Sequence, residues 1–439
     1  MDHATTRTRL EPVSLLLFAF AWLLPVPAGA AFSDGFVGCS TSDDAFAFDL
    51  DTYAVGAPLD LLPEGNYPYD ATIRPDGAEV WLVGASGDGV VVVDRGTNTI
   101  THRIATGEYP TSIAFSNDGT LALVSCRDTE EVTRIDTETY LVTGSLALPT
   151  GIDGGNLALD PVSGNFYLVD WYDGTLFEIA PDGSAILRDA DLGDSLWQLV
   201  VDPDGSRIFV TDRGTDQVRV IERATLTQSA TVAVGDDPWG IDITQSGDRL
   251  VVVCEDSHEA FLIDAGTLTA EALALDGDAD PRDVDIRDDR GRAFVCGGRL
   301  ADGSDPIYVI DLAGGIVETS FEANGTNPNV VAVQAQMHAE SNTVSGSPDL
   351  EDRARLTAFP HPLVAGSTLR YTLPRPGTVE LTLHDATGRR IAVLDRGHRA
   401  AGTHGIAWSF SGERWSPGVS FARLLHDGEV VTFRLVGVR

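Results

Sequence analysis

The sequence predicts an all-β protein in which a seven-bladed β-propeller is followed by a small C-terminal β-sandwich. Three observations support this fold class. A glycine turn recurs at the length of one propeller blade, short apolar strands surround each turn in a constant order, and this period ends near residue 336. No segment after the first thirty residues has the 3.6-residue apolar period of an amphipathic helix.

The repeat is marked by a turn of the Asp-Gly or Ser-Gly type whose glycines are 42, 45, 41, 42 and 44 residues apart. About 40–45 residues is the length of a four-stranded blade. Each turn lies between two short apolar strands, such as 71–73 and 80–83 in the first unit. The turns are Asp76-Gly77, Asp118-Gly119, Ser163-Gly164, Asp204-Gly205, Ser246-Gly247 and, in degenerate form, Arg290-Gly291.

Seven first strands can be recognised, but the seventh unit stops after its first strand at 330–333. Its other strands are expected near the beginning of the chain, at 36–39, 45–49 and 57–61. Pairing both ends in one blade satisfies edge hydrogen bonds that would otherwise stay open. We therefore expect the propeller to span residues 31–336. The residues that precede the first strands are Pro68, Pro110, Gly154, Leu196, Pro238, Pro281 and Pro328.

Several units share further motifs, namely Phe209-Val210-Thr211-Asp212, Thr137-Glu138-Thr139 after the third strand at 132–136, and the lead-ins Gly107 to Pro110 and Gly235 to Pro238. With these motifs the repeat region resembles the YVTN-type propeller family of exported and surface-layer proteins of bacteria and archaea. The resemblance implies the propeller fold. It implies little about function, because the motif residues build turns and core.

The composition of residues 337–355 predicts a polar linker, and the strands expected beyond it no longer follow the blade period. Alternating strands with glycine turns predict an immunoglobulin-like β-sandwich over 356–439. This stretch resembles the C-terminal sorting domain of type IX secretion and the related domain of flagellar hook-capping proteins. The resemblance implies contact with a secretion machinery and attachment to the cell surface. An accessory β-sandwich without a sorting role is the alternative.

Residues 1–30 have the layout of a cleaved signal peptide, with Arg7 and Arg9 before an apolar run and the small triplet 28–30 at its end. The run, 13–24, is shorter than the roughly 20 residues of a membrane-spanning helix. We therefore expect an exported protein without membrane insertion, either secreted or displayed at the cell surface, with the periplasm as an alternative.

The formal net charge of −36 is unevenly distributed. Residues 356–439 contain ten arginines and six acidic residues, so the part before them, 31–355, carries about −40. Such a surface repels phosphate, and we expect no nucleic-acid partner. The chain contains no lysine, which excludes Schiff-base chemistry and a phosphate-binding loop lysine.

Catalytic motifs are not found in the sequence. The histidines in or near the ring, His102, His258 and His338, occupy no position that repeats between units, and neither a Gly-x-Ser-x-Gly elbow nor a Cys-x-x-Cys pair occurs. We expect no cofactor, although the acidic loops at 276–280 and 236–237 leave a structural calcium ion as an alternative. Because Cys39, Cys126, Cys254 and Cys296 lie at equivalent blade positions, they are expected to be free thiols rather than disulfides.

The residues that open each first strand are expected to form the rim of the central channel. Aromatic faces combined with a few polar groups at one opening favour ligand binding. The alternative is that the aromatic side chains plug the channel or pack between blades. The predicted rim residues are Tyr69, Asp70, Thr111, Trp197, Gln198, Trp239, Arg282, Asp283 and Asn329.

These features predict a non-enzymatic binding protein whose propeller engages a protein, peptide or glycan and whose last domain serves secretion or surface attachment. One alternative is a calcium-assisted hydrolase or lyase of the lactonase kind. Another is a structural component of a surface layer. An enzyme needs acidic or histidine side chains that converge on a bound metal, whereas a binding protein needs only an accessible aromatic rim.

Overall fold

The computed structural model describes residues 35–193, 195–275, 279–298, 300, 303–333, 355–359, 368–373, 375–385, 390–400, 402–407, 418–426 and 429–437. The predicted signal peptide lies outside the described residues, as do 337–354 of the linker and 276–278 of the acidic loop. The described residues form strands and a single short 3₁₀ turn, η1 (Asp288–Arg290). None of their helical segments is long and apolar enough to cross a membrane.

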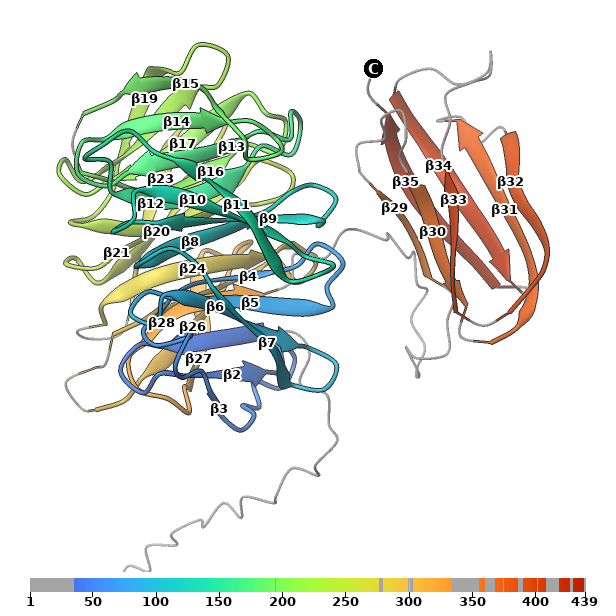
Figure 1. Cartoon of the computed structure of the whole chain (residues 1–439), viewed down its shortest axis with the longest axis horizontal. Coiled ribbons are helices and arrows are strands. Elements are labelled where there is room, and N and C mark those ends of the chain that lie inside the picture. Colours follow the sequence, from blue (N-terminus) through green and yellow to red (C-terminus); the bar gives the residue numbers. More distant parts are fainter. Residues whose placement is uncertain are drawn as a thin grey trace, which may run out of the picture.

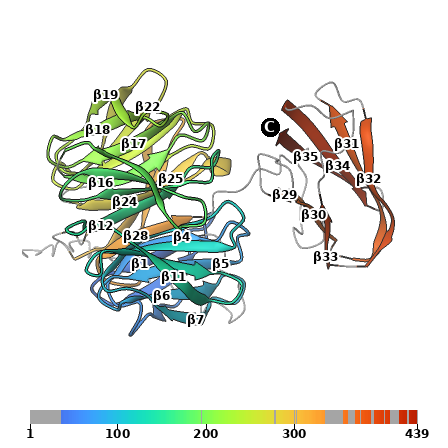
Figure 2. The same ribbon diagram turned by 45° about the horizontal axis from the view of Figure 1, so that its top comes forward.

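Residues 35–333 form seven four-stranded antiparallel sheets (Figure 1; Figure 2). The first three in chain order contain β4 (Pro68–Ile73), β5 (Glu79–Gly84), β6 (Gly89–Asp94) and β7 (Thr99–Ala105); β8 (Pro110–Phe115), β9 (Leu121–Cys126), β10 (Glu131–Asp136) and β11 (Leu141–Ala147); and β12 (Gly154–Leu159), β13 (Phe166–Asp170), β14 (Thr175–Ile179) and β15 (Ile186–Asp191).

The next three sheets repeat this order. They contain β16 (Leu196–Val201), β17 (Arg207–Asp212), β18 (Gln217–Glu222) and β19 (Thr227–Ala233); β20 (Pro238–Ile243), β21 (Arg249–Cys254), β22 (Glu259–Asp264) and β23 (Thr269–Ala274); and β24 (Pro281–Arg287), β25 (Arg292–Gly297), β26 (Pro306–Asp311) and β27 (Ile316–Glu322). The all-β class and the propeller architecture predicted from the sequence are confirmed.

The seventh sheet joins the two ends of the repeat. It contains β28 (Pro328–Val333), β1 (Gly35–Cys39), β2 (Asp44–Phe48) and β3 (Leu59–Asp60). β28 pairs antiparallel with β1, with Val331 opposite Val37, as the sequence led us to expect. Since β28 also contacts both β24 and β4, the first strands follow one another in a closed circle.

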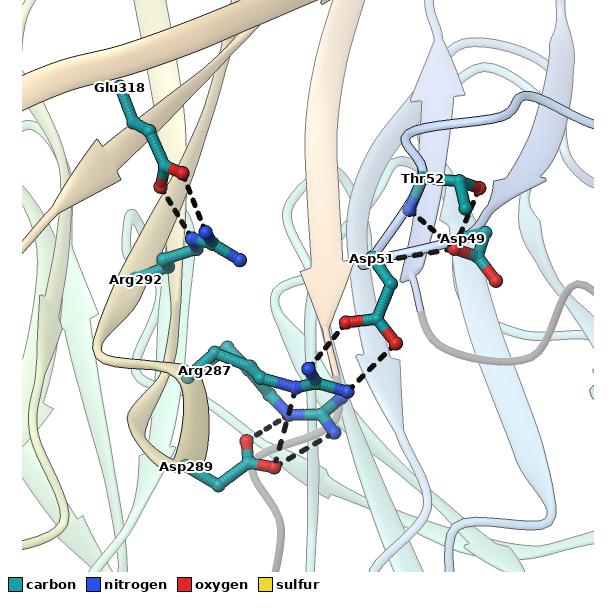
Figure 3. A network of polar contacts seen from close by, with 8 residues as sticks. Asp49, Asp51, Thr52, Arg287, Asp289, Arg292 and Glu318 are labelled. Carbon is teal, nitrogen blue, oxygen red and sulfur yellow. Dashed lines mark hydrogen bonds and ion pairs between the residues drawn. The ribbon is translucent and has the colours of Figure 1, made fainter. Parts of the chain in front are cut away.

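Charged side chains reinforce the junction between the sixth and seventh sheets (Figure 3). Both terminal guanidinium nitrogens of Arg290, in η1, donate to the Asp51 carboxylate of the turn after β2, with an Nη2 to Oδ2 distance of 3.1 Å. Asp49 fixes that turn, because its Oδ1 accepts the backbone N–H and the hydroxyl of Thr52 at 2.7 and 2.8 Å. The closure therefore combines a strand ladder with an ion pair at the surface.

The core lies between neighbouring sheets rather than within one layer. The second strands, such as β5 and β21, are buried on both faces, whereas the fourth strands, such as β7 and β19, are mostly exposed. One example of the packing is Trp81, which meets Phe115 of the next sheet edge-on at 5.3 Å. This explains why the second and third strands read as continuous apolar runs in the sequence.

The C-terminal part forms a β-sandwich of a three-stranded and a four-stranded sheet. The sheets contain β29 (Arg355–Phe359), β30 (Thr368–Leu373) and β33 (Gly402–Ala407), and β32 (Arg390–Arg399), β31 (Gly377–Asp385), β34 (Gly418–His426) and β35 (Glu429–Gly437). Alternate residues of β30 and β31, among them Leu369, Tyr371 and Leu381, face each other in its core. The small β-sandwich predicted after the propeller is thereby found.

Candidate functional site

The first strands of the seven sheets follow one another in a closed circle, and the predicted rim residues lie in the second and third positions of these strands. We call the axis of this circle the channel, and its end where the first strands begin the mouth. The predicted residues fall into two groups there. The first group is an aromatic series with arginines above it, and the second is a set of polar side chains that link neighbouring strands.

Four aromatic side chains form a continuous series across the mouth. Trp171 stacks on Trp197 with ring centroids 4.2 Å apart and an interplanar angle of 16°, and Trp197 meets Trp239 edge-on at 4.6 Å. Tyr69, from the first sheet, contacts Trp171 of the third at 5.5 Å. We call Tyr69, Trp171, Trp197 and Trp239 the aromatic series. Because its members come from four sheets, it bridges the ring, and the buried Trp171 joins it to the core between the third and fourth sheets.

The sequence analysis did not predict Trp171, which comes directly after β13. The residue of the third sheet that is equivalent to Tyr69 and Trp197 is Gly155. A Cβ atom on Gly155 would lie 2.5 Å from the indole ring of Trp171, so the indole occupies the space of the absent side chain. The Trp171 indole N–H donates to the carbonyl oxygen of Trp197 at 3.0 Å. A glycine at a position that holds a larger side chain in the other six sheets was the signal that another side chain fills this space.

Arg213 covers the aromatic series and was also missed. Its guanidinium carbon lies 4.4 and 4.3 Å from the ring centroids of Trp197 and Trp239, a cation–π geometry. Asp237 holds it there, with 2.6 Å between Arg213 Nη2 and Asp237 Oδ2, and also accepts the Trp239 indole N–H at 3.0 Å. Burial alone would raise the pKa of Asp237, but the bonds from Arg213 and Trp239 lower it overall. The carboxylate therefore stays ionised.

A second arginine, Arg282, also lies over the ring of Trp239. Its guanidinium carbon is 5.6 Å from the Trp239 ring centroid, and its Nε donates to Glu255 Oε1 at 3.0 Å. Arg127 lies over the ring of Tyr109 at 3.7 Å in the equivalent part of the second sheet. Arginines thus lie over aromatic rings at several places around the mouth, and Trp197, Trp239 and Arg282 remain partly exposed.

Two predicted rim residues do not line an open surface, which corrects the sequence analysis. Thr111 is 2% exposed, and its hydroxyl donates to the carbonyl oxygen of Gly154 at 2.9 Å. Asn329 is 7% exposed and donates to the carbonyl oxygen of Pro68 at 3.2 Å. Both side chains join neighbouring first strands, because a short polar group at this position reaches backbone before it reaches the channel.

Asp70, Gln198 and Asp283 also link strands. In five sheets the third residue of the first strand accepts the backbone N–H of the next first strand, and we call these residues the acceptor belt. The bonds run from Ile113 to Asp70 (2.9 Å), Leu157 to Ser112 (3.0 Å), Leu199 to Asn156 (3.1 Å), Ile241 to Gln198 (3.1 Å) and Val331 to Asp283 (2.9 Å). Gly240 cannot take part, and Asp242, two residues later, accepts from Ile286 at 2.7 Å.

The belt carboxylates are protonated more readily than ordinary acids. Burial, followed by the nearby charge of Asp70, raises the pKa of Asp283 to about 7. Burial likewise raises the pKa of Asp70. Asp242 and Asp285 bond to each other, and burial raises the pKa of both. The oxygens of these four acids accept backbone N–H groups or bond to each other, so the main role of the acids is to hold neighbouring first strands together.

The structure offers little for a metal. No group of three His, Cys, Asp or Glu side chains with the arrangement of a metal site occurs among the described residues. Asp237, part of one acidic loop considered for calcium, is bound to Arg213 and Trp239. The other loop falls largely on 276–278, outside the described residues.

The four cysteines are free and buried, as predicted. Burial raises the pKa of the Cys254 thiol to about 12 and also raises the pKa values of the other three thiols. Since a thiolate is the reactive form, these side chains behave as small core residues and not as nucleophiles.

Fold and site together define a β-propeller with an aromatic mouth, followed by a β-sandwich. A functionally unknown protein from Desulfotomaculum acetoxidans has a similar structure, with a TM-score of 0.59 and 14% identity over 69% of this chain and 98% of that one. Hydrazine synthase from Kuenenia stuttgartiensis is similar over 56% of this chain and 76% of that one, at 16% identity and a TM-score of 0.49. No family model matches the chain, and no curated protein sequence does.

Proposed function

We propose that this chain is an exported, non-enzymatic binding protein whose propeller mouth engages a glycan, a peptide or a protein segment. The observation that carries the proposal is the aromatic series with Arg213 held over Trp197 and Trp239. Flat apolar faces next to fixed hydrogen-bonding groups supply contact area and orientation at once.

The mouth is preorganised, which supports a binding role. Arg213 is fixed by Asp237 and Arg282 by Glu255, so a ligand need not order these long side chains on binding. A ligand with a flat apolar face and polar edges fits this arrangement. A polyanion does not, since residues 31–355, which include the whole propeller, carry a formal charge of about −40.

Export and attachment complete the proposal. It assigns residues 1–30 to a signal peptide and the β-sandwich to secretion or surface attachment through the secretion machinery, on the resemblance to type IX sorting domains. The propeller repeat, which resembles the YVTN-type family, would then be presented outside the cell.

The test is an array of glycans and peptides probed with the chain from residue 31, followed by affinity measurements on the ligands found. We expect Trp239→Ala to weaken binding at least tenfold, because it removes the platform beneath both Arg213 and Arg282. The matched control is Tyr53→Ala, which removes an aromatic ring that stacks on Phe321 at 5.4 Å near the junction of the sixth and seventh sheets. Binding by Trp239→Ala at the strength of the unmodified chain would refute the proposal.

Elemental analysis and light scattering of the same sample test the alternatives. A stoichiometric metal ion retained in the channel would favour the calcium-assisted hydrolase or lyase. Ordered self-assembly without any ligand would favour a structural surface-layer component. Either result, together with an array on which nothing binds, would replace the binding function.

A further inference from the structure

The C-terminal β-sandwich contains a polar recess on the side of its four-stranded sheet that faces away from its core. The recess has a volume of about 210 Å³, and three adjacent strands, β31, β32 and β34, contribute to it. It is lined by Glu380, Thr382, His384, Arg390, Arg423 and Leu425.

Strand alternation explains why polar side chains gather there. Val379, Leu381 and Leu383 of β31 point into the core, so the residues between them point to the opposite face. Thr382 forms the floor, since it is only 7% exposed although it lies on this outer face. Its hydroxyl lies 3.0 Å from His384 Nε2 and 3.2 Å from the carbonyl oxygen of Arg423.

The recess carries an excess of positive charge. Its single acid, Glu380, is 3.0 Å from Arg396 and 3.6 Å from Arg390, so two guanidinium groups share one carboxylate. Within the described part of the chain, the exposed Arg423 side chain has no ion-pair or hydrogen-bond partner. An anion placed over the floor would meet Arg390 and Arg423 from the two strands that flank β31.

The net positive charge of the whole C-terminal domain also favours an anionic ligand. Residues 356–439 contain ten arginines against six acidic residues, whereas the rest of the chain is strongly acidic. All the cations are arginine, whose planar fork of donors matches the oxygens of phosphate and carboxylate groups. The volume suits a small group rather than an extended ligand, because pockets for drug-sized molecules begin at roughly 300 Å³.

We propose that this recess binds a phosphate monoester group, with Arg390 and Arg423 as the charged donors and Thr382 and His384 at its floor. The site is separate from the aromatic mouth, and the proposal holds whether or not the mouth binds a ligand. A phosphate group can come from a phosphorylated sugar or from a lipid headgroup, and the same side chains would recognise it in both.

The first experiment titrates the chain from residue 31 with inorganic phosphate by calorimetry, in a buffer free of other oxyanions. We expect one site per chain, at least tenfold weaker binding in Arg423→Gln, and a further loss in Arg390→Gln/Arg423→Gln. Arg375→Gln is the matched control, because it removes an exposed arginine between β30 and β31, outside the recess. Glu380→Gln should strengthen binding, since it removes the one negative charge of the recess.

A second arm distinguishes the sources, with glucose 6-phosphate as the sugar phosphate and phosphatidylcholine vesicles containing phosphatidic acid as the lipid. Binding of either probe that is lost in Arg423→Gln supports the site and names its source. Thermal unfolding of each variant verifies that it is folded, and the gain expected for Glu380→Gln cannot arise from misfolding. No phosphate binding at millimolar concentration, or equal binding by Arg423→Gln and Arg375→Gln, would overturn the proposal.

Discussion

Asp283 provides a direct test of how the acceptor belt holds the ring together. Its Oδ2 accepts the backbone N–H of Val331 at 2.9 Å, and burial raises its pKa from the ordinary value of 3.8 to about 7. Asparagine keeps an oxygen that can accept the same N–H but cannot ionise. We predict that Asp283→Asn has little effect on stability in mild acid and stabilises the protein in mild alkali.

The sign follows from proton linkage. Between pH 3.8 and about 7 the folded chain keeps a proton on Asp283 that the unfolded chain releases. The stability that this proton contributes is therefore fully present below pH 3.8 and is lost as the pH rises through about 7. A pKa shift of this size corresponds to a loss of at most about 4 kcal/mol in the free energy of unfolding at high pH. Water that reaches the half-buried carboxylate screens its charge, and we expect about 2 kcal/mol. For a domain of this size, that is roughly 4 °C in Tm.

The assay is thermal unfolding of both proteins at pH 4, 6 and 8. The quantity to compare is the difference in Tm between the two proteins at each pH, because the net charge of −36 makes the stability of the unmodified protein itself depend on pH. Asp256→Asn, which removes an exposed carboxylate, is the control for a change of net charge alone. A variant that is less stable than the unmodified protein at pH 8, or a difference that is the same at all three pH values, would refute the reasoning.

Two further predictions concern packing and closure. Gly155→Ala should lower the free energy of unfolding, measured by urea titration, by about 2 kcal/mol, because the new Cβ atom would lie 2.5 Å from Trp171. The control Gly96→Ala should have little effect, since the nearest atom to its new Cβ would be 3.5 Å away. Deleting 35–60 removes β1 to β3 and should abolish cooperative unfolding and cause aggregation, measured by light scattering, while a chain ending at 336 should still unfold cooperatively.

The fold could be predicted from the sequence because the repeat fixes spacing, strand order and apolar pattern at the same time. The pairing of β28 with β1 followed from counting strands, since a seventh unit with one strand requires partners from elsewhere. The β-sandwich followed from alternation in segments such as 379–385, whose odd-numbered apolar residues are the ones in the core.

The mouth was predicted only in part. Tyr69, Trp197 and Trp239 were found because they occupy one aligned position of the first strand. Trp171 and Arg213 were missed because they come directly after the second strand, a position that the alignment of first strands does not cover. Asp70, Gln198 and Asp283 of the acceptor belt were predicted as rim residues that bind a ligand, but they accept backbone N–H groups, since sequence alone does not distinguish an acceptor for backbone from an acceptor for ligand.

Asp170 and Asp212 show how far the repeat determines electrostatics. Both end the second strand of a blade and are fully buried, and in both Oδ1 accepts backbone N–H groups of the following turn. Arg219 of the third strand binds Asp212 Oδ2, with 2.7 Å to its Nε.

The residue equivalent to Arg219 in the third sheet is Phe177, and Asp170 Oδ2 has no hydrogen-bond partner among the described residues. Burial therefore raises the pKa of Asp170 despite its backbone bonds. The aspartate at this repeat position is thus bound to an arginine in one blade and lacks that partner in the neighbouring blade. The backbone repeats from blade to blade, but the ion pair depends on a side chain that does not.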